Sequence, residues 1–144
     1  MEKLTLIQTD TTVGFISKNS EILAKRKNRP TGKEFLKVIA SFRELKNIVR
    51  VPKKFRRKIR YSKKTTFIYK NSISVRVVKD GEHNRFLKKY GYFFSSSANI
   101  SGDRFERDIA ENLADIICED KRGFFEITPS KIVKIEKNRA IRIR

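Results

Sequence analysis

A serine-rich segment, Ser95 to Gly102, holds the densest group of side chains in the sequence that could do chemistry. It follows an apolar run and precedes a predicted helix. Backbone N–H groups and hydroxyls in such a position can hold a phosphate or a carboxylate. A serine-rich connection with glycine is also typical of an ordinary loop, so the segment by itself leaves both interpretations open.

A second polar segment runs from Thr9 to Gly14. Its hydroxyls could form hydrogen bonds with a small polar substrate at the end of a strand, although threonine is also common within strands. Several cations follow at the expected end of a helix, where they interact well with the helix dipole whether or not a ligand is present: Lys25, Arg26, Lys27 and Arg29. Near the C-terminus, Ser130 stands in a loop that enters a strand, and it could simply stabilise a turn.

Structural metal and disulfide chemistry are not expected. The chain has one cysteine, Cys118, and one histidine, His83. A lone cysteine cannot form an internal disulfide, and these two residues cannot build a standard zinc site. We expect no dedicated protein metal site.

The composition predicts a single folded domain spanning residues 1–144, since 38% hydrophobic residues and 11 Phe suffice for a core. The 35 Lys and Arg residues against 16 Asp and Glu residues give a net charge of +19, which favours a polyanionic partner. The sequence shows no long apolar run and no signal-like start. We therefore expect a cytoplasmic protein that has no membrane partner.

The charge is unevenly distributed. No Asp or Glu lies between Glu44 and Asp80, and the stretch from Leu45 to Val78 is the predicted RNA-contacting surface. An acidic run from Asp103 to Glu126 should face away from RNA. An ordinary solvated face is the alternative for the basic stretch, but the net charge favours binding. The residues expected to bind RNA are Lys53, Lys54, Arg56, Arg57, Lys58, Arg60, Lys63 and Lys64.

The pattern of apolar and β-branched residues predicts a mixed sheet with helical cover, which is an α/β fold. A hairpin is expected on either side of Lys70 and Asn71. Helices are predicted at 20–27, in two pieces beginning near Ser41 and Pro52, within 80–91, and at 107–113. Strands are predicted at 4–7, 13–16, 35–40, 65–69, 72–78, 92–95, 115–118, 131–135 and 140–144.

Taken in order, these polar segments resemble the YrdC-like family of threonylcarbamoyl-AMP synthases across nearly the whole chain. The most specific match is the S-x-S-A-N-x-S-G loop, present as Ser95 to Gly102. Other family elements have counterparts in Thr9–Gly14, Lys27–Pro30, Ser72–Arg76, Pro129–Val133 and Ile141–Arg142. The chain resembles a shortened member, with Val13 in place of a tyrosine, and with Ser62–Thr66 in place of P-G-P-x-T.

The resemblance implies a single-domain, twisted mixed β-sheet with helices around a cationic cavity. There, L-threonine, bicarbonate and ATP, which carries Mg²⁺, would give threonylcarbamoyl-AMP for the modification of tRNA, together with partner proteins of that pathway. Lys27 and Arg29 would be the catalytic cations. Thr9, Ser97 and Ser130 would bind threonine. The ATP-binding residues would be Lys27, Arg29, Arg76, Asn99, Ser101 and Arg142.

Two further interpretations remain. A noncatalytic YrdC-like module that binds tRNA or ribosomal RNA would explain both the motifs and the charge. An anion-binding structural protein would explain the charge but not the ordered motifs. Release of pyrophosphate that depends on threonine and bicarbonate would separate the enzyme from the binding module.

Overall fold

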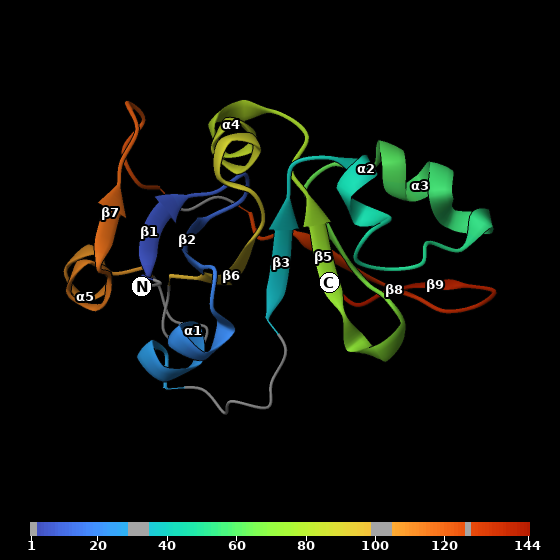
Figure 1. The fold of residues 1–144 in the computed structure, drawn as a ribbon, viewed down its shortest axis with the longest axis horizontal. Coiled ribbons are helices and arrows are strands. Elements are labelled where there is room, and N and C mark those ends of the chain that lie inside the picture. The colour runs from blue at the N-terminus through green and yellow to red at the C-terminus, as the bar shows by residue number, and fades with distance from the viewer. Residues whose placement is uncertain (1–2, 29–34, 99–104, 126–127) are drawn as a thin grey trace. The chain divides into compact units, whose positions relative to one another are not determined.

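The structure of the protein is a computed structural model, which describes residues 3–28, 35–98, 105–125 and 128–144 (Figure 1). The chain divides into two compact units. The first unit comprises Met1–Phe35 and Phe93–Pro129, and the second comprises Leu36–Tyr92 and Ser130–Arg144. Both contain parallel and antiparallel strand pairs together with helices, which confirms the predicted α/β class.

The first unit is built on a hairpin. β1 (Thr5–Gln8) and β2 (Val13–Ser17) are antiparallel, and all of their residues are buried. β6 (Phe93–Ser97) pairs antiparallel with β2, and β7 (Ile116–Cys118) pairs parallel with β1. The helices in the described part of this unit are α1 (Ser20–Arg26) and α5 (Arg107–Leu113). Its core contains Leu4, Leu6, Phe15, Leu23 and Ala110.

The second unit contains five strands in the order β3-β5-β4-β8-β9. The pairs β3–β5 and β4–β8 are parallel, whereas β4–β5 and β8–β9 are antiparallel. The strands are β3 (Leu36–Ile39), β4 (Thr65–Ile68), β5 (Ser74–Val77), β8 (Lys131–Ile135) and β9 (Ala140–Arg142). The helices are α2 (Phe42–Leu45), η1 (Lys53–Phe55), α3 (Arg56–Tyr61), η2 (Lys70–Ser72) and α4 (Gly81–Tyr90).

Apolar side chains anchor the basic segment, residues 45–64, to this sheet. Leu45, Val51, Phe55 and Ile59 are all buried in the same cluster as residues of β3, β4, β5 and β8. Phe55 and Ile59 are four residues apart, so they lie on one face of a helical turn. The cations between them are exposed as a consequence, because the buried face is already occupied.

The predicted hairpin near Lys70 is present, but its turn differs from the prediction. Ser72 was expected in a strand, yet it lies in η2 with a φ of 62°, and β5 begins only at Ser74. The backbone N–H of Ser72 bonds to the carbonyl of Tyr69, and the Tyr69 N–H bonds to the carbonyl of Ile73. The chain therefore turns tightly before it can pair.

The helix α2 begins with the predicted cap. The Ser41 hydroxyl accepts a hydrogen bond from the Glu44 N–H at 3.3 Å. The Glu44 carboxylate accepts from the N–H of Ala40 at 3.4 Å, one residue before the position of a standard capping box. Glu44 therefore stabilises both the end of β3 and the start of α2.

Asn84 connects α4 to two strand ends. It is 4% exposed, and its side-chain amide donates to the carbonyls of Ala40 at 3.1 Å and Val78 at 2.7 Å. Removing a buried amide that satisfies two backbone carbonyls is strongly destabilising, because both acceptors would lose their partner.

Asn84→Ala should therefore lower the free energy of unfolding by about 1–3 kcal/mol, measured by urea denaturation. The control is Arg85→Ala on the same helix, whose exposed ion pair with Glu82 should contribute less than about 1 kcal/mol. Equal stabilities of the two variants would contradict a connecting role for Asn84.

Candidate functional site

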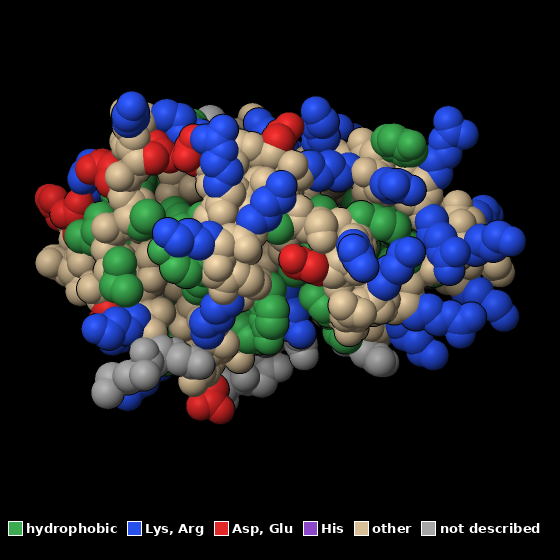
Figure 2. Space-filling model, turned by 45° about the horizontal axis from the view of Figure 1, so that its top comes forward, with side chains coloured by type: hydrophobic (Ala, Val, Ile, Leu, Met, Phe, Trp, Pro, Cys, Tyr) green, Lys and Arg blue, Asp and Glu red, His purple; other side chains and the backbone are tan. Residues whose placement is uncertain are grey.

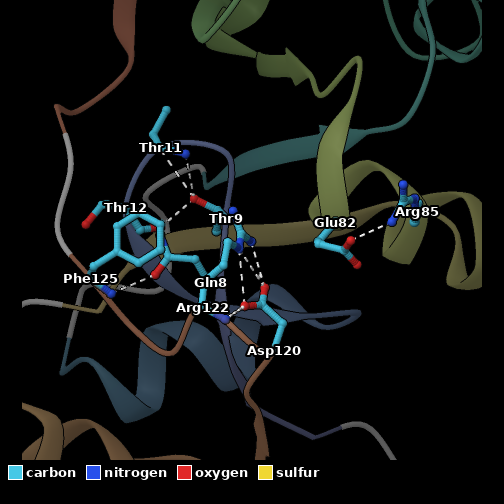
Figure 3. Close-up of polar contacts among 9 residues, drawn as sticks. All are labelled: Gln8, Thr9, Thr11, Thr12, Glu82, Arg85, Asp120, Arg122 and Phe125. Carbon is cyan, nitrogen blue, oxygen red and sulfur yellow. Dashed lines mark hydrogen bonds and ion pairs between the residues drawn. The ribbon is translucent and has the colours of Figure 1, made fainter.

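The turn between β1 and β2 is held by its own threonines (Figure 3). The Thr9 hydroxyl donates to the carbonyl of Thr12 and accepts from the N–H of Thr11 at 3.2 Å. The Thr9 N–H also donates to the Thr12 carbonyl, at 3.3 Å. Thr9 and Thr11 are buried, so these bonds fix the shape of the turn. In this geometry the Thr9 hydroxyl donates its proton to a hydrogen bond within the turn.

Gly14 lets this turn approach the serine strand β6. Its Cα partner across the sheet is Ser97. A Cβ atom at Gly14 would lie 3.0 Å from the carbonyl oxygen of Ser96 and 3.2 Å from Cγ2 of Thr9. The final glycine of the Thr9–Gly14 motif is thus required by the close packing of two predicted site segments.

Lys27 joins the same group of residues. It caps the C-terminal end of α1, and its Nζ donates to the hydroxyl of Ser96 at 2.9 Å and to the carbonyl of Ser97 at 2.6 Å. The structure therefore brings together Lys27, Ser97 and, through Gly14, Thr9. A cation at a serine-rich strand end is an arrangement that can hold an anion.

Sequence reasoning overlooked Ser96, although it is adjacent to Ser97. The alternation of side chains along a strand could have indicated that Ser96 and Ser97 point to opposite faces. Three other predicted residues, Arg29, Asn99 and Ser101, lie outside the described residues.

A second group of polar side chains lies in the second unit. The hydroxyls of Thr66 and Ser130 are 3.0 Å apart, and Arg144 donates to Ser130 through Nη2 at 3.3 Å and through Nε, to the carbonyl, at 3.0 Å. Arg76, which is 4% exposed, pairs with Thr66 across β4 and β5, so the two side chains share a face of the sheet. A guanidinium buried in a sheet is costly unless it is well bonded.

The arginine in this group is not the one that the sequence suggested. The side chain of Arg142 is exposed and has no hydrogen-bond or ion-pair partner among the described residues, whereas the side chain of Arg144 contacts Ser130. The terminal Ile-Arg-Ile-Arg places two arginines in one alternating pattern, so spacing could not distinguish them. Thr66 was not predicted as a site residue either, because the Ser62–Thr66 segment matches its family motif only in part.

The basic segment has the exposure that the prediction requires. All eight cations expected to bind RNA are exposed, from Lys53 to Lys64. The segment is tied to its unit by Lys54, whose Nζ donates to the carbonyl of Asn138 at 2.8 Å, and by Lys79, which donates to the carbonyl of Arg60. Burial, and then repulsion from Lys63, lowers the pKa of Lys79.

Four acidic residues of the first unit are paired with its own arginines. Arg26 contacts Asp115 at 3.1 Å, and Arg107 contacts both Glu111 and Glu119. The hydrogen bond from the Leu4 N–H, followed by that from Arg26, lowers the pKa of Asp115. Arg122 likewise contacts Asp120 at 2.6 Å (Figure 3). With 11 Lys and Arg against 12 Asp and Glu, the first unit is close to neutral.

None of the helices in the described part of the chain is both long and apolar enough to cross a membrane. Within residues 3–28, 35–98, 105–125 and 128–144, no three His, Cys, Asp or Glu side chains are grouped so that they could hold a metal ion.

Comparison with known proteins identifies the family. Residues 1–144 match the family model Sua5_yciO_yrdC, described as Telomere recombination, and the chain therefore belongs to the Sua5/YciO/YrdC family. This confirms the resemblance seen in the sequence. A search of curated proteins finds no match.

Solved structures of the same fold agree. Sua5 of P. abyssi complexed with L-threonine has a TM-score of 0.81 at 17% identity, covering 99% of this chain and 50% of that chain. YciO of E. coli has a TM-score of 0.80 at 18% identity, covering 99% and 82%. MTH1692 of Methanobacterium thermoautotrophicum has a TM-score of 0.71 at 17% identity, covering 98% and 79%. The chain spans about half the length of the Sua5 structure that it matches.

Gly14→Ala should destabilise the protein by about 1–3 kcal/mol in urea denaturation, because the added methyl overpacks the contact between the Thr9 turn and β6. Adding Thr9→Ser, which removes the Cγ2 methyl at 3.2 Å, should recover part of the loss. A Gly14→Ala variant as stable as the parent protein would show that this contact can relax freely.

Proposed function

We propose that the protein is a threonylcarbamoyl-AMP synthase, which makes threonylcarbamoyl-adenylate from L-threonine, bicarbonate and ATP for the modification of tRNA. The observation that carries the proposal is the contact of Lys27 with Ser96 and Ser97, which unites two family motifs in one place. Family membership supports it. The structure of P. abyssi Sua5 complexed with L-threonine supports the choice of amino acid.

The chemistry requires positive charge above all. The threonine amine attacks bicarbonate and water is lost, which gives a carbamate. A carbamate oxygen then attacks the α-phosphorus of ATP, the bond to the β-phosphate oxygen breaks, and pyrophosphate leaves. Both reactants are anions, so cations must offset their repulsion before the new bond can form.

Lys27 would supply such a cation in the first unit. Its Nζ has the serine hydroxyl and the strand carbonyl as fixed partners, and these hold the ammonium at the end of β6. Ser97 would orient threonine, and Thr9 would shape the wall next to it. Arg29, Asn99 and Ser101 remain predictions for phosphate binding. Mg²⁺ would enter with ATP as part of the substrate.

The polar group of the second unit would bind charged parts of the substrates. Ser130 remains the predicted contact for threonine, and Arg76 a predicted contact for phosphate. Arg144 is the more suitable C-terminal arginine, because it already donates to the hydroxyl of Ser130. Arg142 remains a prediction as a second phosphate contact. No covalent nucleophile is needed, since positioning and charge supply the rate.

The decisive experiment measures release of pyrophosphate from ATP by the purified chain. Release that depends on both threonine and bicarbonate supports the synthase. Release that depends on neither, or no release at saturating substrates, rejects it.

Lys27→Ala should reduce this activity by about 10²–10³-fold, because an ammonium that offsets charge near the transferred group is removed. Lys25→Ala, on the exposed face of the same helix, is the matched control and should keep full activity. Circular dichroism should show both variants folded. Unchanged turnover of Lys27→Ala at saturating substrates would remove Lys27 from the catalytic group.

A second candidate function, RNA binding, is favoured by a separate observation. The second unit carries 24 Lys and Arg residues against four Asp and Glu residues, whereas the first carries 11 against 12. The second unit therefore carries a net charge of +20 and the first unit −1, so all of the excess positive charge belongs to the second unit. On the face drawn in Figure 2, Lys and Arg side chains gather densely over elements of this unit. A surface of this kind would hold the phosphates of tRNA or another RNA.

Reversing Lys53, Lys54, Arg56 and Arg57 to Glu should weaken the binding of different RNAs to a similar degree, because cations that hold phosphates carry no sequence information. The log–log dependence of affinity on salt should become shallower by about 0.7 for each phosphate of a single strand that the variant no longer neutralises. The matched control reverses four exposed lysines of the first unit, Lys3, Lys18, Lys25 and Lys121, and so changes the net charge equally. Equal effects of the two variants would mean that total charge, not this segment, governs binding.

A further inference from the structure

A pocket of about 400 Å³ opens in the second unit, between α2 and the start of α3. Its size lies in the range of about 300–1,000 Å³ that is typical of small-ligand sites. None of the residues expected from the family resemblance to bind threonine or ATP lines it. The lining residues are Phe42, Lys46, Asn47, Ile48, Val49, Arg50, Val51 and Arg56.

The lining combines an apolar wall with three cations. Phe42, Ile48, Val49 and Val51 pack with the core cluster of the unit, so this wall is fixed by the fold. Lys46, Arg50 and Arg56 are exposed, and none of the three has a carboxylate within ion-pair distance among the described residues. The best ligand for such a surface is an anion that also has an apolar face.

Phe42 offers a ring for stacking. The Nζ of Lys46 and the Cζ of Arg60 each lie 5.9 Å from its ring centroid, near the limit of about 6 Å for a cation–π contact. Both side chains are exposed and belong to flexible residue types, so they can move aside or cover a flat group placed on the ring.

A second aromatic ring stands on α3. Tyr61 is 72% exposed, the highest exposure among the large hydrophobic side chains that the structure describes. It ends the helix that begins with Arg56, about 7.5 Å further along the helix axis at 1.5 Å per residue. One exposed aromatic residue needs no explanation by itself. Two accessible rings among exposed cations form the combination that binds unpaired bases and their phosphates.

We propose that the Phe42 pocket and Tyr61 form a stacking site for single-stranded RNA. One base stacks on Phe42 and a second base on Tyr61, and the adjoining backbone phosphates lie on Lys46, Arg50 and Arg56. This inference rests on the RNA-binding function proposed above and specifies the form of RNA. A duplex keeps its bases stacked inside, so it cannot offer them to these rings. A free nucleotide would satisfy the pocket but would leave most of the surrounding charge unused.

The test compares fluorescence anisotropy of three probes: a labelled single-stranded RNA, the same length of RNA duplex, and labelled AMP. Tyr61→Ala should weaken single-stranded binding about tenfold, since the variant lacks the ring on which the second base stacks. Tyr61→Phe should bind normally, and duplex affinity should not change. The salt dependence should stay the same, because every cation that holds a phosphate is still present.

Arg50→Ala should have the complementary effect, making the log–log salt dependence shallower by about 0.7. Tyr90→Ala on α4 is the matched control for removal of an exposed tyrosine in the same unit and should bind like the parent protein. Phe42→Leu keeps the wall filled while it removes the ring, and it should also weaken single-stranded binding selectively.

Three results would overturn the stacking site. Unchanged single-stranded affinity in both Tyr61→Ala and Phe42→Leu would show that the rings do not contact bases. Equal weakening on single strand and duplex would show that only charge matters. AMP binding as tight as that of the single strand would make the pocket a nucleotide site. If the parent protein bound none of the RNAs, the RNA-binding function itself would fail, which is a different outcome from these.

Discussion

The second unit depends on apolar contacts that hold a strongly basic segment against the sheet. Its 24 cations and four acids leave a large excess of positive charge, and repulsion of this kind opposes compaction. Burial of Leu45, Val51, Phe55 and Ile59 opposes that repulsion, at roughly 1.5–3 kcal/mol for each fully buried large side chain. Because the buried residues occupy one face of η1 and α3, the cations are left on the other face.

The first unit depends instead on close packing of small residues. Gly14 has no side chain, and this allows the Thr9 turn and the serine strand to meet within 3.2 Å of where a Cβ would stand. Lys27 then reaches the end of the same strand. The polar side chains in this unit are therefore positioned by a sheet whose strands β1 and β2 are fully buried.

Much of this arrangement could be predicted from the sequence. Apolar runs located every strand among the described residues, and the cap at Ser41 was visible as a Ser and a Glu three residues apart. The turn at Ser72 was missed because a left-handed serine leaves no mark in composition. Local patterns also could not choose between Arg142 and Arg144, since only pairing with β8 decides which one reaches Ser130. The division into two compact units arises from long-range contacts, which no local pattern records.

The loop before β4 shows how one segment can keep part of a family motif while another part changes. Thr66 corresponds to the threonine of P-G-P-x-T, and its hydroxyl still meets Ser130 at 3.0 Å. Lys64 stands at the second proline but has a φ of 50°, a conformation that the proline ring forbids because it fixes φ near −65°. The backbone of this loop therefore cannot follow the family pattern at Lys64. The change retains the polar contact inside the sheet and exposes Lys63 and Lys64 at the surface.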